Sequence, residues 1–138
     1  MKNLFVLIVL FCFVLGYGQK SKLSAEHYQK VRKVFRHKMP DNSVAVLFSA
    51  PIRNRANDVD YIYHQDPNFF YLTGWHQPHS VLMIYKNPQT DSQGVYYEKI
   101  YVPERDVYME MWNGKRYDLE QVKLLGFDRA AVRGDFKN

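Results

Sequence analysis

The sequence has 138 residues, of which 46% are hydrophobic and 24% charged, and a formal net charge of +5 at pH 7. This length is sufficient for one hydrophobic core and leaves little room for a second domain. The charge excess is modest and lies mostly around the first predicted helix, which indicates a solvated helix face and argues against a nucleic-acid-binding protein.

The first residues have the pattern of a signal peptide. Lys2 precedes an unbroken apolar run over residues 4–15, and two glycines follow within three residues. The run is shorter than the roughly 20 residues of a membrane-spanning helix and fits the roughly 7 to 15 residues of a signal-peptide core. We expect residues 1–19 to be removed and residues 20–138 to be periplasmic or secreted. The single cysteine, Cys12, lies in the removed segment, so the mature fold would have no disulfide.

The mature chain begins with a predicted amphipathic helix over residues 24–39, for which Ser24 is the N-cap. Residues 43–49 form a nearly continuous apolar run, which predicts a strand buried on both faces. Residues 52–68 are mostly polar and show no hydrophobic period, so they predict a long loop whose tyrosines favour an ordered conformation.

The middle of the chain is rich in β-forming residues. Residues 69–73 and 81–85 are predicted strands, joined by a connection that contains Pro78. Residues 87–94 read as a turn-rich break, and residues 95–102 supply the next strand.

The last third of the chain predicts one more helix and one more strand. The helix covers Leu119–Leu125, with Asp118 as N-cap and Gly126 after its end. Residues 127–132 are the last predicted strand. This order of elements predicts an α/β fold in which helices flank a mixed, twisted sheet. We expect a fragment of a longer protein, because residues 134–138 offer neither a terminal helix nor a tail.

The sequence argues against nucleophilic and phosphate-binding enzymes. The mature chain has no cysteine and no G-x-S-x-G motif, so the usual activated nucleophiles are missing. It also has neither G-x-G-x-x-G nor a P-loop.

A metal site is the more serious chemical hypothesis. Three histidines lie near one another in the sequence, and three aspartates could join them. The spacing is weak evidence, because a proline lies between the last two histidines and makes helical geometry there improbable. The candidate ligands are His64, His76, His79, Asp58, Asp60 and Asp66.

Two sequence blocks resemble a known family. In the first block, residues 61–74 read Y-x-Y-x-Q-D-x-x-F-x-Y-L-T-G. The second block has two stretches, V-P-E-R-D over residues 102–106 and E-M-W-N-G-K-R over residues 110–116. In this order they resemble the N-terminal domain of the Xaa-Pro aminopeptidases (aminopeptidase P) of the creatinase/prolidase type. The resemblance spans roughly residues 24–132, and His64 departs from it, since the family usually has arginine there.

The resemblance implies two domains, an N-terminal domain with a ribonuclease-H-like sheet and a C-terminal "pita-bread" domain. The catalytic domain would hold two metal ions, commonly manganese, and hydrolyse the bond between an N-terminal residue and proline. This chain would then contain no catalytic or metal-binding residue of its own. Its partners would be the C-terminal domain, further copies in a homo-oligomer, and peptides with proline at the second position.

The resemblance also points to two substrate-binding residues. Trp112, within E-x-W-x-G-x-R, is similar to an aromatic residue that reaches the proline side of the substrate. Asp58 is similar to an acidic residue near the cleft in which the family binds its substrate. The open alternatives are local roles for both residues, namely a packing anchor for Trp112 and a loop cap for Asp58.

Two other classes remain open at this stage. The chain could be a non-catalytic binding or oligomerisation module, or a small metalloprotein that uses the three histidines. A downstream reading frame with metal ligands would favour the aminopeptidase, and metal analysis of the purified protein would test the metalloprotein.

Overall fold

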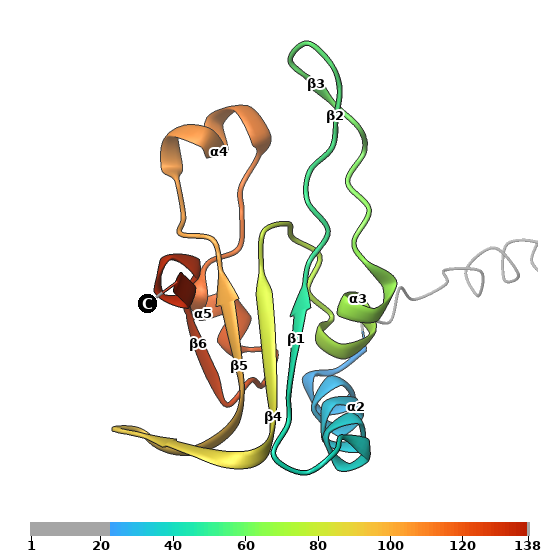
Figure 1. The fold of residues 1–138 in the computed structure, drawn as a ribbon. Helices are drawn as coiled ribbons and strands as arrows, with labels where there is room; N and C mark the ends of the chain where they lie inside the picture. Colours follow the sequence, from blue (N-terminus) through green and yellow to red (C-terminus); the bar gives the residue numbers. More distant parts are fainter. Residues whose placement is uncertain (1–22, 138) are drawn as a thin grey trace, which may run out of the picture.

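The computed structural model describes residues 23–137, so the predicted signal peptide lies outside the described part of the chain. A four-stranded sheet forms its centre, and two projections rise from one end of that sheet (Figure 1). In chain order the elements are α2 (Ala25–Lys38), β1 (Val44–Phe48), β2 (Asn54–Ala56), β3 (Val59–Asp60), α3 (Pro67–Thr73), β4 (Val81–Asp91), β5 (Gly94–Val102), α4 (Val107–Asn113), α5 (Leu119–Lys123), β6 (Arg129–Val132) and the 3-10 helix η1 (Arg133–Lys137).

The sheet is mixed, as predicted. Its strand order is β1-β4-β5-β6. The β1/β4 and β4/β5 pairs are antiparallel, whereas β5 and β6 run parallel, with Lys99 opposite Arg129. Two parallel strands need a crossover connection, and here the connection contains both α4 and α5. The mixed sheet and its helices confirm the predicted fold class.

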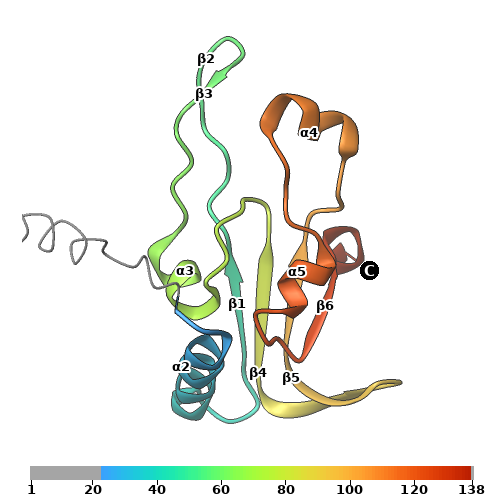
Figure 2. The ribbon, with the colours of Figure 1, turned by 180° about the vertical axis from the view of Figure 1, so that it is seen from behind.

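The hydrophobic core lies between one face of the sheet and the helices. Figure 2, seen from behind, shows α5 in front of β5 and β6. Strand side chains alternate between the two faces, and Leu82 and Ile84 of β4 with Ile100 and Val102 of β5 point into this core. The buried core cluster consists of Phe69, Leu72, Trp75, Leu82, Ile84, Ile100, Val102 and Val122.

A buried ion pair connects α2 to strand β5 of the sheet. The Nε of Arg32 donates to Glu98 Oε1 at 2.8 Å, and Arg32 is fully buried. The two terminal nitrogens of Arg32 donate to the carbonyls of Leu72 and Gly126. The guanidinium therefore has partners on three segments, as a buried charge requires.

The predicted strand over residues 69–73 is wrong, because these residues belong to the helix α3. Asp66 is its N-cap and accepts from the Phe69 N–H at 2.9 Å, and Pro67 occupies the first turn. Gly74 ends the helix with φ of 66°. A capping aspartate, a proline at the helix start and a glycine after its end outweighed the β propensity of the aromatic residues.

Other local expectations also need correction. β1 is not buried on both faces, since Val44, Val46 and Phe48 are exposed. The predicted break over residues 87–94 is largely strand, because β4 continues to Asp91 and pairs closely with β5. The sequence reading also missed α4, the short β2/β3 hairpin and η1.

Within residues 23–137, no helix combines the length and the apolar character needed to cross a membrane.

Candidate functional site

Two projections rise side by side from the same end of the sheet (Figures 1 and 2). One is the β2/β3 hairpin, which carries Asp58 in its turn. The other is α4 with its flanking segments, which carries Trp112. The two residues predicted to contact substrate therefore lie on the two projections.

The hairpin is held by its own polar side chains. The Asn54 side-chain amide donates to the Asn57 carbonyl at 2.9 Å and to the Val59 carbonyl at 3.3 Å. Asn57 adopts φ of 51°, a conformation that asparagine tolerates better than most residues. These contacts leave Asp58 exposed at the tip, where a carboxylate can meet a partner.

Gln65 anchors the base of the hairpin to the core. Its Oε1 accepts from the Ala50 N–H at 2.8 Å, and its Nε2 donates to the carbonyls of Trp75 and Gln77, both at 3.1 Å. The Tyr63 hydroxyl donates to the Ala50 carbonyl at 3.2 Å, and burial raises the pKa of Tyr63 to about 12. The neighbouring His64 is exposed, so the departure from the family's arginine falls on the surface and leaves the Gln65 anchor intact.

An ion pair between the two stretches of the second sequence block stabilises α4. Arg105 donates from Nε and Nη2 to both carboxylate oxygens of Glu110, at 2.9 to 3.1 Å. Glu110 also accepts from the Arg116 N–H at 3.0 Å. These bonds lower the pKa of the Glu110 carboxyl, with the Arg105 contact as the main cause. Asp106 caps the helix by accepting from the N–H groups of Tyr108 and Met109.

Trp112 lies in the last turn of this braced helix with 76% of its surface exposed. A tryptophan normally buries its large ring within its own domain. Within residues 23–137, the indole therefore makes little contact with its own domain. The ring is therefore free to stack on a ligand or on another chain.

The structure keeps the two predicted contact residues apart within this chain. Across residues 23–137, the hairpin and α4 share no hydrogen bond, ion pair or aromatic contact. Each projection is fixed at its own base, so a ligand or a second protein surface would have to bridge Asp58 and Trp112.

The candidate metal ligands are not gathered into a site. His76 packs edge-on against the rings of Tyr63 and Phe70, and Asp66 is used as the α3 cap. Among the residues that the structure describes, no group of three or more histidine, cysteine, aspartate or glutamate side chains could hold a metal ion. The residues present therefore do not fit a pair of manganese ions, and the metalloprotein hypothesis gains no support.

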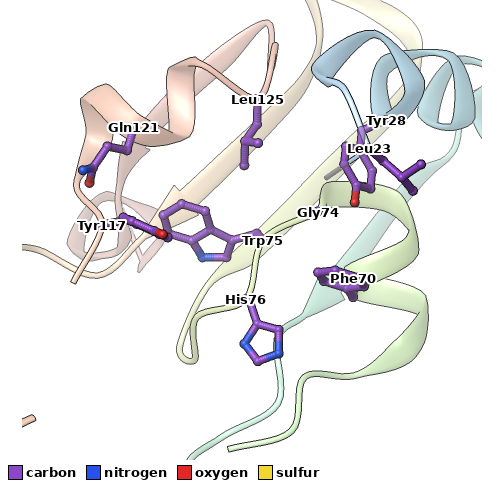
Figure 3. Close-up of a pocket in the computed structure, with 9 residues that line it drawn as sticks. All are labelled: Leu23, Tyr28, Phe70, Gly74, Trp75, His76, Tyr117, Gln121 and Leu125. Carbon is purple, nitrogen blue, oxygen red and sulfur yellow. The ribbon is translucent and has the colours of Figure 1, made fainter. Parts of the chain in front are cut away.

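A separate pocket of about 630 Å³ lies between α3, α5 and the start of α2. Figure 3 shows the Trp75 ring in its wall, with Tyr117 beside it and Phe70 across from it. The Trp75 N–H donates to Ser80 Oγ at 2.8 Å, and the Trp75 and Tyr117 ring centroids are 5.9 Å apart. The sequence did not predict this pocket, because the residues that line it come from segments that are far apart in the chain. It includes neither Trp112 nor Asp58.

The chain matches the family model described as the aminopeptidase P N-terminal domain over residues 28–138. It is 32% identical to the Xaa-Pro aminopeptidase of Escherichia coli over 111 residues, which cover 80% of this chain and 24% of that protein. It is 36% identical to human Xaa-Pro aminopeptidase 3 over 101 residues, which cover 71% of this chain and 19% of that protein.

Solved structures agree with these sequence matches. The structure of E. coli aminopeptidase P with the inhibitor Pro-Leu superposes with a TM-score of 0.71 and 30% identity, covering 83% of this chain and 26% of that one. Aminopeptidase PepP of Pseudomonas aeruginosa gives the same TM-score and identity. The chain thus spans about a quarter of the length of these relatives or less.

Proposed function

This chain belongs to the aminopeptidase P family, whose N-terminal domain it carries, and we propose on this premise that it is the non-catalytic domain of an exported Xaa-Pro aminopeptidase. Such an enzyme releases the residue that precedes proline at the N-terminus of a peptide. Two manganese ions in a C-terminal domain would supply an activated water for hydrolysis. The much greater length of the relatives supports a further domain.

The match to the aminopeptidase P N-terminal domain over residues 28–138 is the observation that carries this proposal, and the exposure of Trp112 supports a contact between this residue and the substrate. An exposed indole in the last turn of α4 can stack on the pyrrolidine ring of a substrate proline while its N–H remains free to donate. We assign Asp58, on the other projection, to the polar side of the same substrate. Projections of this kind would reach beyond their own domain, toward the active site of a neighbouring copy in a homo-oligomer.

The test uses this chain extended through the coding sequence that follows Asn138, assayed with manganese on a peptide that begins Xaa-Pro. We expect hydrolysis by the extended protein and none by the present chain. Trp112→Ala should raise KM by about tenfold, because stacking and burial of the ring are lost. Trp112→Phe should recover part of this loss.

Tyr108→Ala is the matched control, because Tyr108 lies on the same helix and is 66% exposed. It should leave KM unchanged. Equal KM values for the Trp112→Ala variant and the parent protein would remove Trp112 from the substrate site.

A non-catalytic binding or oligomerisation module is the second candidate function. The exposed apolar side chains of α4 favour it, since such a surface usually contacts another protein. Val107, Tyr108, Met109, Met111 and Trp112 are all exposed. A lack of hydrolysis by the extended protein, together with self-association that depends on α4, would establish this function in place of the enzyme.

A further inference from the structure

α2 and α5 pack on the same face of the sheet, and Figure 2 views the molecule from their side. A hydrogen bond connects the ends that meet, since the Gln29 side-chain amide donates to the Gly126 carbonyl, just after α5, at 2.9 Å. The exposed residues of the two helices therefore lie on one side of the molecule, which we call the basic face. It comprises Lys30, Lys33, Val34 and Lys38 of α2 with Lys123 and Leu124 of α5.

The basic face carries an excess of positive charge. α2 contains five lysine and arginine residues and a single acidic residue, Glu26. Within residues 23–137, the three lysines of α2 form no salt bridge. On α5, Lys123 pairs with Glu120 at 2.6 Å, and beyond the end of α2, Asp41 lies 3.9 Å from Lys86. An anionic partner would therefore meet three free ammonium groups on α2.

Exposed apolar side chains lie among these lysines. Leu124 is 77% exposed and Val34 48%, and Leu23, just ahead of α2, is 53% exposed. Single exposed apolar residues are ordinary on a protein surface. Their combination with lysines is typical of interfacial helices, in which leucine enters the lipid layer while lysine meets anionic headgroups. The apolar side chains thus favour a lipid surface over a soluble polyanion, which would need the lysines alone.

We propose that the basic face binds the surface of a membrane that contains anionic lipids. The lysines would contact headgroup phosphates, and Val34 and Leu124 would enter the boundary between headgroups and acyl chains. Residues 20–24, which include two further lysines, connect the predicted signal peptide to α2, so export would bring this face close to a membrane. The inference goes beyond the proposed function and rests on neither hydrolysis nor oligomerisation.

Membrane binding through the basic face would leave the two projections free. They rise from one end of the sheet, whereas α2 and α5 lie along its side (Figures 1 and 2). Asp58 and Trp112 would then be held beside the membrane and not against it, so that a peptide could reach both residues.

Sedimentation with lipid vesicles tests the proposal. The protein used starts at residue 20, because the apolar run over residues 4–15 would bind lipid by itself, and it continues through the coding sequence after Asn138. We expect binding at low salt to vesicles of phosphatidylcholine with phosphatidylglycerol, but not to phosphatidylcholine alone. The variant with Lys30→Gln, Lys33→Gln and Lys38→Gln should bind about a hundredfold more weakly, since each lysine near an anionic surface contributes about fivefold.

The matched control is the variant with Arg53→Gln, Arg55→Gln and Lys115→Gln. It removes the same number of positive charges from exposed positions on or beside the two projections. Because salt screens charges that lie far from the membrane, this variant should bind no more than about threefold more weakly than the parent protein. Both variants should keep the unfolding midpoint of the parent, which shows that each remains folded.

An environment-sensitive dye measures insertion into the lipid. Residues 20–138 contain no cysteine, so Leu124→Cys provides a single labelling site once any downstream cysteine is replaced by serine. The emission of the attached dye should shift to shorter wavelength when anionic vesicles are added. Val95→Cys, at the exposed tip of the β4/β5 hairpin, is the control and should show no shift.

Three results would overturn the proposal. One is no binding to anionic vesicles at low salt, and another is an equal loss of binding in both triple variants, which would show attraction by net charge alone. The third is binding to polyglutamate as tight as that to vesicles, with no emission shift at position 124, which would assign the basic face to an acidic protein. Membrane binding by an extended protein that hydrolyses no peptide would keep this inference and reject only the proposed enzyme.

Discussion

His79 combines an unusual backbone conformation with positively charged surroundings. Its φ is 58°, a region that asparagine adopts more readily than most residues. Partial burial of the ring, followed by the charges of Arg133 and Arg116, lowers the pKa of the imidazole below its ordinary value of 6.5. A lowered pKa in the folded state means that the related stability is present above pH 6.5 and is lost as the pH falls through the folded value.

We therefore expect His79→Asn to flatten the dependence of unfolding free energy on pH below about 6.5. The effect should be small, because the side chain is largely exposed and solvent screens it. Urea unfolding at pH 5 and pH 8 measures it, with His64→Asn in the exposed loop as the control. An unchanged difference between the two pH values in His79→Asn would contradict the electrostatic account.

Several features of single residues could not be predicted from the sequence. The aromatic and acidic residues of the two projections could be named from sequence blocks, but spacing alone gave no reason for Trp112 to be exposed. The Arg32–Glu98 pair joins residues 66 positions apart, and no local signal connects them. Arg105 and Glu110 are only five positions apart, yet their pairing depends on a helix that the sequence reading did not find.

At the level of elements, the Glu110 carboxylate should decide how rigid α4 is. In the described structure this seven-residue helix has no buried residue, so the bonds from Arg105 and the Arg116 N–H are its main supports besides the Asp106 cap. Glu110→Gln should give severalfold faster hydrogen exchange of the amides in residues 105–116, because a neutral amide is a weaker partner for arginine.

The midpoint of global unfolding should stay unchanged in the same variant, since α4 lies outside the core. Glu104→Gln, an exposed neighbour, serves as the control and should leave exchange unchanged. A fall in global stability would show that α4 supports the fold, whereas unchanged exchange would show that the ion pair does not brace it.

The elements that sequence predicted well have a strong local signal. α2 has its apolar residues at helical spacing after a serine N-cap, and β5 is a run rich in valine, tyrosine and isoleucine, which favour strands. α3 failed because its aromatic residues favour strands, while the Asp66, Pro67 and Gly74 signals fix a helix. β1 was assigned to the right residues but the wrong environment, because an apolar run does not reveal whether a second layer covers it.

For the whole molecule, the proposed separation between this domain and a catalytic domain makes a prediction about metal content. The residues described here include no cluster of three or more metal-ligating side chains. After purification with manganese and extensive dialysis, the given chain should retain far less than one metal ion. The extended protein should retain about two, as expected for a dinuclear hydrolase.

Elemental analysis of the two proteins, prepared in parallel, measures this difference. A His64→Ala, His76→Ala, His79→Ala variant of the given chain controls for weak binding by exposed histidines. The opposite result is a given chain that retains one metal ion or more and loses it in this variant. That result would contradict the proposal that metal binds outside this domain, and it would make the three histidines candidate ligands again. Two ions in the extended protein, unchanged by the same three substitutions, would place the metal chemistry outside this domain.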